Sequence, residues 1–69
     1  MRNTFKEKIV ELRKEKGLTQ QKLAEDLGFS RSAVTEWEVR GKEPSFDTLI
    51  LIAKYFGVTT DYLLGLEDY

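Results

Sequence analysis

The feature that most restricts how this chain can fold is the three-residue stretch Gly28-Phe29-Ser30. The residues before it, 20–27, and after it, 31–38, both repeat apolar side chains at helical spacing. Gly28 is a typical helix stop and Ser30 a typical N-terminal cap, so we expect one helix to end and another to begin here. Two helices joined so closely must cross at a large angle, which is the helix-turn-helix arrangement.

Three further amphipathic segments surround this pair, at residues 4–16, 46–56 and 61–64. No stretch alternates apolar and polar residues in the way that a half-buried strand does, so we predict an all-α fold of five helices. Residues 39–43 are expected to form a loop before Pro44. At 69 residues, the chain has the length of one small domain, residues 1–69. The remaining predicted caps are Thr19, Ser45 and Thr60, and the remaining predicted stops are Gly17 and Gly57.

The composition removes most enzyme classes. The chain has no Cys and no His, so it cannot form a thiol nucleophile, an imidazole base or a Cys/His zinc site. The pairs Glu25-Asp26 and Glu67-Asp68 belong to polar surfaces and do not make a paired-carboxylate site. We therefore predict no enzyme activity, no metal and no cofactor. Without a long apolar run, we also predict no membrane contact and a cytoplasmic location.

The charge is distributed unevenly along the chain. Residues 1–42 carry ten Lys and Arg against seven Asp and Glu, a net of +3, whereas residues 43–69 carry one against five, a net of −4. The overall charge of −1 hides this difference. One half of the molecule can therefore face a polyanion, although charges of both signs also simply solvate helices.

The helix expected at residues 31–38 has a distinct polar face. At about 100° per residue, the apolar side chains of this segment share one side and leave four polar side chains on the other. Short side chains at the centre let a helix approach a major groove closely, and a flanking Arg reaches guanine or a phosphate. We expect base contacts from Arg31, Ser32, Thr35 and Glu36.

Residues 18–64 resemble the lambda-repressor and Cro type of helix-turn-helix, also called the XRE family. The resemblance runs through LTQQKLAEDLGFSRSAVTEWE, then GKEPSFDTL, IAKYFGV and DYLLG, in order and at the spacing expected of the family. It implies a five-helix repressor-like bundle in which helices two and three form the DNA-binding unit. It also implies a sequence-specific regulator of transcription, most simply a repressor, that binds double-stranded DNA as a dimer on an inverted repeat.

The resemblance assigns further residues to this interface. It places Gln20 on a phosphate and pairs Arg13 with Glu38, an ion pair that ties the first helix to the end of the third. Further contacts to the DNA backbone are expected from Ser30, Arg40 and Lys42.

Two positions depart from the family pattern. Many members have one residue between Trp-Glu and Gly, whereas here Val39 and Arg40 both precede Gly41. Glu36 stands where the family often has an uncharged or basic side chain. A carboxylate near phosphates repels them unless it accepts from cytosine N4 or pairs with a cation such as Arg40. We expect Glu36 to affect selectivity more than affinity.

The acidic half offers a possible dimer surface. In residues 46–56, Leu51 lies opposite the apolar face formed by Leu49, Ile52, Ala53 and Phe56, with Phe46 at the edge of that face. We predict a homodimer through Leu51, Leu66 and Tyr69. The alternative function is an antitoxin or adaptor of the same fold, whose main contact is a protein partner.

Overall fold

The computed structural model describes residues 4–67, and over these residues it contains helices and no strands. In chain order, the helices are α1 (Thr4–Glu15), α2 (Gln20–Leu27), α3 (Arg31–Thr35), η1 (Glu36–Arg40), α4 (Phe46–Phe56) and α5 (Thr60–Leu63). η1 is a turn of π-helix that continues α3 directly, so the two form one helical rod. The predicted all-α fold with five helices is confirmed.

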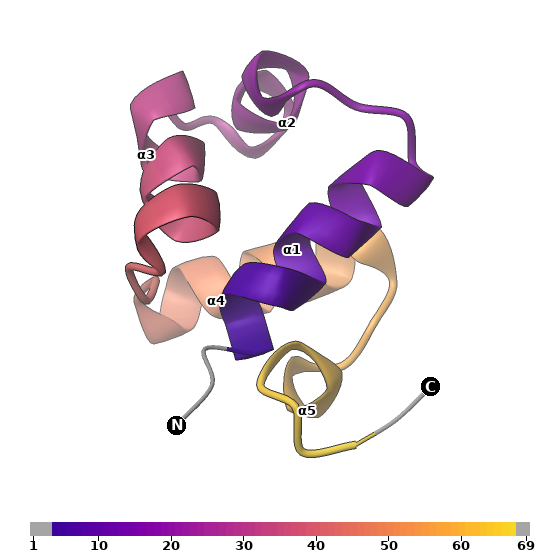
Figure 1. Cartoon of the computed structure of the whole chain (residues 1–69). Helices are drawn as coiled ribbons and strands as arrows, with labels where there is room; N and C mark the ends of the chain where they lie inside the picture. The colour runs from indigo at the N-terminus through magenta and orange to yellow at the C-terminus, as the bar shows by residue number, and fades with distance from the viewer. Residues whose placement is uncertain (1–3, 68–69) are drawn as a thin grey trace.

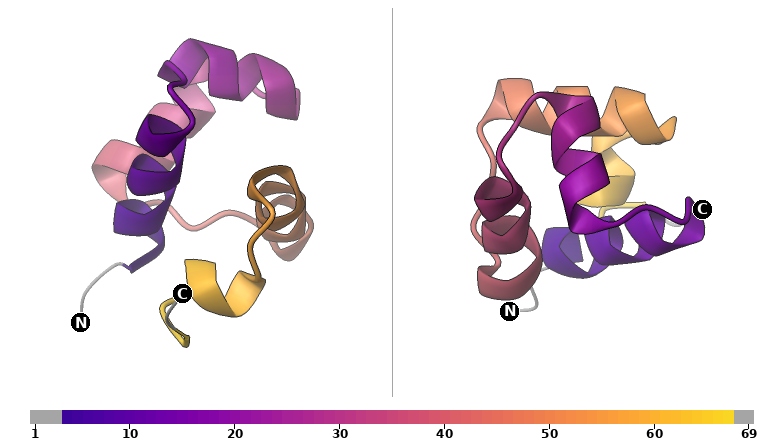
Figure 2. Two further views of the ribbon diagram at one scale, coloured as in Figure 1. Left: turned by 90° about the vertical axis from the view of Figure 1, so that its right-hand side faces the viewer. Right: turned by 90° about the horizontal axis from the view of Figure 1, so that it is seen from above.

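The helices enclose a single core. Figure 1 shows α2 and the start of α3 at one end of the molecule and α5 at the other. In the side view of Figure 2, α1 and α4 lie on opposite sides of the bundle. α1 contacts η1 and α5, while α4 contacts α2 and α5. The buried apolar residues come from every helix: Phe5, Ile9, Leu23, Ala24, Leu27, Val34, Trp37, Leu49, Ile52, Ala53 and Leu63.

Hydroxyl side chains cap the N-termini of three helices at the predicted residues. Each hydroxyl accepts a hydrogen bond from the backbone N–H three residues later: Thr19 from Lys22, Ser30 from Ala33 and Ser45 from Thr48. These bonds satisfy N–H groups that the first turn of a helix leaves without a partner. The boundaries of α2 and α4 consequently agree with the sequence analysis.

Three predicted helix boundaries are wrong by one residue: the end of α1 and both ends of α5, which runs from Thr60 to Leu63 instead of 61–64. The first helix ends at Glu15 instead of residue 16. α5 is capped by Thr59, whose hydroxyl accepts from the Tyr62 backbone N–H at 3.0 Å, and Thr60 is its first helical residue. Both threonines suit an N-cap, so the path of the chain after Gly57 decides between them.

The third helix is longer than predicted and changes its geometry. It continues past Glu38 to Arg40, so the loop begins at Gly41 instead of Val39. Gly41 adopts φ 68°, a left-handed conformation that glycine takes without strain, and its N–H donates to the Glu36 carbonyl five residues back. The extra residue before this glycine, noted in the sequence, is therefore accommodated by a π-turn, which is wider than an α-helical turn.

Phe46 was expected at the edge of the buried face of α4, and this expectation is wrong. Its side chain is 85% exposed, whereas Leu49, Ile52 and Ala53 are buried. Phe46 occupies the first position of α4, at the end of the helix, where the core does not cover it.

Candidate nucleic-acid interface

The four predicted base-contacting residues share one side of the α3–η1 rod. Arg31 and Ser32 are exposed, and Thr35 and Glu36 are half-buried. The other side of the rod is held in the core by Val34, which is fully buried, and by Trp37. We call Arg31, Ser32, Thr35 and Glu36 the polar face of α3. Because the rod is anchored along its opposite side, this face is presented to solvent on a fixed support.

A buried ion pair holds the end of this rod on α1. The Arg13 Nε donates to Glu38 Oε2 at 2.6 Å, and Nη2 donates to Oε1 at 3.0 Å. The third guanidinium nitrogen donates to the Leu18 carbonyl at 2.7 Å. The Glu38 side chain is only 3% exposed, so its carboxylate depends on these donors in place of water. The structure thus brings together the two residues of the expected ion pair.

Gln20 connects this ion pair to the polar face. Its Nε2 donates to Glu38 Oε1 at 3.0 Å, and its Oε1 accepts from the Thr35 hydroxyl at 3.2 Å. This contact between Gln20 and Thr35 could not be predicted from spacing, because the two residues belong to different helices and lie fifteen positions apart. The amide nitrogen carries a second hydrogen, which can serve the phosphate contact expected of Gln20.

The structure gives Glu36 one of the two partners that the sequence left open. Glu36 Oε2 lies 3.6 Å from Arg40 Nε, one helical turn away. The Arg40 side chain is 74% exposed, and such pairs contribute little to stability. The contact nevertheless places a cation beside the carboxylate and reduces its repulsion of a nearby anion.

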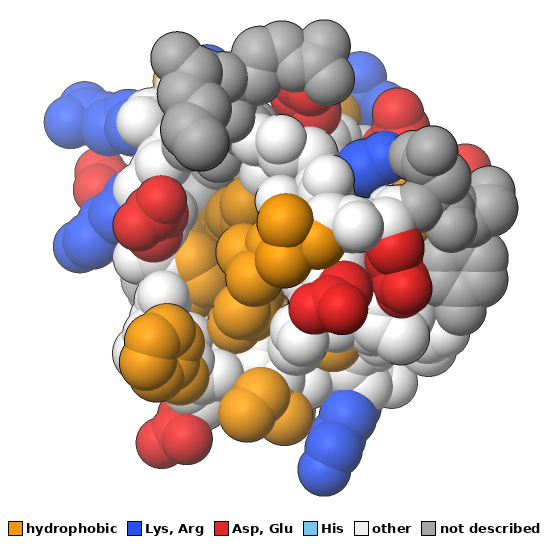
Figure 3. All heavy atoms as spheres, turned by 90° about the horizontal axis from the view of Figure 1, so that it is seen from below, with side chains coloured by type: hydrophobic (Ala, Val, Ile, Leu, Met, Phe, Trp, Pro, Cys, Tyr) orange, Lys and Arg blue, Asp and Glu red, His pale blue; other side chains and the backbone are white. Residues whose placement is uncertain are grey.

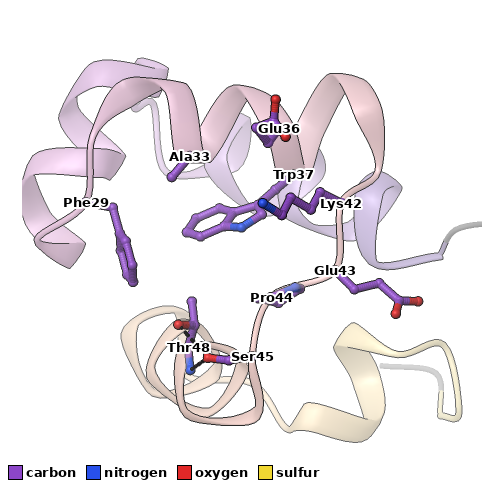
Figure 4. A pocket seen from close by; sticks show the side chains of 9 residues that line it. All are labelled: Phe29, Ala33, Glu36, Trp37, Lys42, Glu43, Pro44, Ser45 and Thr48. Carbon is purple, nitrogen blue, oxygen red and sulfur yellow. Dashed lines mark hydrogen bonds between the residues drawn. The ribbon is translucent and has the colours of Figure 1, made fainter.

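The other residues expected on the DNA backbone are also exposed. Ser30, Arg40 and Lys42 lie at the two ends of the rod and just beyond it. Figure 4 shows Glu36 and Lys42 on the same side of a pocket of about 200 Å³, while Glu43 points away. These positions place charged side chains along the border of the polar face.

Aromatic packing holds the joint between α2 and the rod. Phe29, in the connection, packs edge-to-face on Trp37 with ring centroids 5.5 Å apart. Both rings line the pocket of Figure 4 together with Pro44. This contact fixes the angle at which the rod leaves α2, a role for Phe29 that the sequence analysis missed.

A polar contact holds α2 on α4, away from the polar face. The Tyr55 hydroxyl donates to Asp26 at 2.6 Å, and Lys22 lies 3.1 Å from the same carboxylate. The hydrogen bond from Tyr55, followed by that from Lys22, lowers the pKa of Asp26. The same contacts with Asp26 raise the pKa values of Tyr55 and Lys22. This contact ties α2 to α4 in addition to the apolar core.

Several large apolar side chains are exposed on the α4–α5 half of the molecule. Leu51 is 42% exposed and Leu66 is 73% exposed, as a contact surface requires. Tyr69, the third residue of the predicted dimer interface, lies outside the described residues. Figure 3 shows hydrophobic side chains gathered at the centre of the face that contains α5. We call the following residues the apolar group: Phe46, Ile50, Leu51, Leu64 and Leu66.

The described part of the chain holds no group of acidic side chains arranged to bind a metal ion. Over residues 4–67, no helix combines the length and the apolar character needed to cross a membrane.

The arrangement of α2, the short connection and α3 defines a helix-turn-helix domain. The sequence profile of the helix-turn-helix family HTH_3 matches residues 9–63. The chain belongs to this family of XRE/Cro-type transcriptional regulators. Membership in a family of regulators, and not of enzymes, agrees with the composition.

Named relatives support this assignment. The HTH-type transcriptional activator BcrR of Enterococcus faecalis is 45% identical over 64 residues, which cover 93% of this chain and 31% of BcrR. The uncharacterized HTH-type transcriptional regulator YqaE of Bacillus subtilis is also 45% identical over 64 residues, or 55% of YqaE. The crystal structure of a transcriptional regulator from Listeria innocua superposes with a TM-score of 0.82 at 31% identity, covering 94% of this chain and 61% of that one. The chain therefore spans about a third to three fifths of these proteins.

Proposed function

We propose that this chain binds double-stranded DNA sequence-specifically and regulates transcription, with α3 in the major groove. The observation that carries the proposal is the polar face of α3 on its anchored rod, since a short helix with exposed donors and acceptors fits a major groove. Arg31, Ser32, Thr35 and Glu36 supply base contacts, while Gln20, Ser30, Arg40 and Lys42 position the DNA backbone. This role implies a cytoplasmic location.

Selection from a random pool of double-stranded DNA tests this proposal directly. We expect an enriched inverted repeat whose half-sites are about one helical turn, roughly 34 Å, apart. The variant Arg31→Ala serves as a control, because it removes one base contact from an exposed position. Failure to enrich any sequence at moderate salt would contradict the proposal.

The inverted repeat requires two copies of the chain, and we propose that the apolar group forms the homodimer contact. A self-complementary surface around a two-fold axis is the usual arrangement, and exposed leucines favour it. Light scattering should give a dimer mass for the wild type and a monomer mass for Leu51→Glu. The substitution Val39→Glu is a matched control, since it also replaces an exposed apolar side chain by a carboxylate but lies on η1, outside the apolar group. Monomers in all three samples would contradict a dimer.

Repression is the simplest regulatory outcome. A dimer bound across a promoter blocks polymerase by occupying the site and needs no further contact. A reporter gene with the selected operator placed over its promoter should show lower expression when the chain is present. Higher expression would identify an activator.

The apolar group also favours a second candidate, in which the chain is an antitoxin or adaptor that binds another protein. Exposed apolar side chains suit either a second copy or a different partner. A stable complex with another protein, formed without DNA and lost in Leu51→Glu, would support this candidate.

A further inference from the structure

Four side chains form a continuous hydrogen-bonded chain from α1 to the polar face of α3. Arg13 donates twice to Glu38, at 2.6 Å and 3.0 Å. Glu38 accepts from the Gln20 amide at 3.0 Å, and Gln20 accepts from the Thr35 hydroxyl at 3.2 Å. We call this series the Arg13–Thr35 relay. Its last member is one of the residues expected to contact bases.

The chemistry of each group fixes the direction of the relay. A guanidinium only donates hydrogen bonds, and an ionised carboxylate only accepts them. The Gln20 group that faces Glu38 must therefore be the NH₂, and this orientation turns the Gln20 carbonyl oxygen toward Thr35. A carbonyl oxygen only accepts, so in any hydrogen bond between these two groups the Thr35 hydroxyl is the donor. A cation on α1 thus turns an acceptor toward the hydroxyl on α3.

The backbone carbonyl of Arg31 is a second acceptor for the Thr35 hydroxyl. The Thr35 hydroxyl also lies 3.1 Å from the Arg31 backbone carbonyl, one turn earlier in α3. Both groups to which the structure bonds this hydroxyl are acceptors. Its single proton is directed at one of these two protein acceptors. A further partner of Thr35 Oγ1 therefore meets a lone pair and not the proton.

We infer that Thr35 is a specificity-determining residue that accepts a hydrogen bond from the exocyclic amino group of adenine or cytosine. This inference rests on the proposed function, because it requires α3 to lie in the major groove. In that groove, adenine N6 and cytosine N4 are the donors, whereas guanine N7 and O6 and thymine O4 are acceptors. A hydroxyl that cannot donate outward rejects guanine and thymine at the position it faces. Gln20 is the positioning residue that maintains this orientation.

Ser32 provides a contrast on the same face. Its hydroxyl lies 2.9 Å from the Ser30 hydroxyl, and either of these groups can be the donor. No acceptor-only group holds the Ser32 proton in that contact, so Ser32 can donate to or accept from a base. Thr35 should therefore discriminate between amino and carbonyl groups, and Ser32 should not.

The test begins with the operator selected by the wild-type chain. Thr35→Val removes the hydroxyl and keeps the shape, whereas Thr35→Ser keeps the hydroxyl and removes the methyl group. We expect one position in each half-site to carry adenine or cytosine with wild type and Thr35→Ser, and to lose this preference with Thr35→Val. Circular dichroism and binding to non-specific DNA identify any variant that has lost its fold.

A modified operator isolates the hydrogen bond. At the position sensitive to Thr35, the amino base is replaced by its analogue without the amino group, purine for adenine or 4-deaminated pyrimidinone for cytosine. Wild-type affinity should fall by about 2- to 12-fold, the value of one neutral hydrogen bond. The affinity of Thr35→Val should change by less than that. An equal loss in both proteins would overturn the inference.

Other outcomes separate this inference from the proposed function. Guanine or thymine at the Thr35-sensitive position would overturn the inference alone, as would unchanged preferences in Thr35→Val. A pool from which no sequence is enriched would overturn the proposed function, and the inference with it.

Gln20→Met tests the relay itself, because methionine has a similar length and no amide. Thr35 then retains only the Arg31 carbonyl as an acceptor, and its hydroxyl is freer to rotate outward. We expect guanine or thymine to become tolerated at the Thr35-sensitive position, with the preferences set by Arg31 unchanged. Unaltered discrimination at that position would show that Gln20 does not orient Thr35, and a uniform weakening at all positions would assign Gln20 to phosphate contact only.

Discussion

The polar face of α3 and the apolar group on the α4–α5 half are both open to solvent, yet they are supported differently. The polar face is braced from beneath by the Arg13–Thr35 relay and by buried Val34 and Trp37. The apolar side chains stand on helix ends and outer faces, and Phe46 is 85% exposed. The polar face is thus oriented before it meets a partner, whereas the apolar group depends on a partner to be covered.

The largest expected effect comes from breaking the support of the polar face. Glu38→Ala leaves the Arg13 guanidinium, whose side chain is 13% exposed, without its carboxylate. We expect the free energy of unfolding to fall by about 3–5 kcal/mol, as for other buried ion pairs that lose one partner. Urea unfolding followed by circular dichroism measures this change.

The control for this prediction is Glu36→Ala, which removes an exposed carboxylate from the same rod. Its pair with Arg40 is open to water, so stability should change by no more than about 0.5 kcal/mol. Similar losses in Glu38→Ala and Glu36→Ala would contradict the view that the polar face is braced by a buried ion pair.

The second prediction concerns Gly65, which follows α5 and packs against the start of α1. Gly65 adopts φ 78°, and a Cβ added there would lie 2.5 Å from the Thr4 Cγ2 at the start of α1. Gly57 adopts a similar φ of 69° with nothing within 4 Å of such a Cβ. Gly57→Ala should lose about 1–2 kcal/mol from the left-handed backbone alone, and Gly65→Ala should lose more. Thermal unfolding of both variants measures the difference in stability. Equal losses of stability would show that the chain around Gly65 shifts to accommodate the added methyl group.

The third prediction concerns the polar face itself. Arg31→Ala should weaken binding to the selected operator by about 1–3 kcal/mol if the guanidinium pairs with guanine through two hydrogen bonds. Stability should change little, because Arg31 is exposed. Titration of labelled operator and of non-specific DNA separates base contact from backbone contact. Equal loss on both DNAs would assign Arg31 to a phosphate.

The smallest effect is a pH dependence from the contact between α2 and α4. The lowered pKa of Asp26 means that its stabilising contribution is present above its ordinary pKa of 3.8 and is lost as the pH falls through the lowered value. The raised pKa of Tyr55 means that its contribution is present below its ordinary value of 10.0 and is lost as the pH rises through the raised value. The wild type should exceed Tyr55→Phe in stability between these limits, and the difference should shrink at both ends. Urea unfolding across the pH range checks this, and a constant difference would exclude titration of this pair as its source.

Much of the fold could be predicted because its signals are local. Hydroxyl caps such as Thr19, Ser30 and Ser45 act on the N–H three residues away, so sequence spacing contains the whole interaction. The sequence could not show whether Thr59 or Thr60 caps α5, because both residue types and positions suit an N-cap equally well. The exposure of Phe46 depends on what lies beside the end of α4, which helical periodicity does not describe.

Residue order alone was enough to predict five helices, the tight connection between α2 and α3, and the four polar residues that share one face. These follow from periodicity and capping, which act over a few residues along the chain. The packing of α2 against α3 was needed to show that Gln20 meets Thr35 and Glu38, and the folded chain was needed to show that the rod ends in a π-turn. The contacts of Gln20 join different helices, so no local rule of spacing or capping describes them. The residues of the polar face were therefore predictable from the sequence, but the contact of Gln20 with the Thr35 hydroxyl was not.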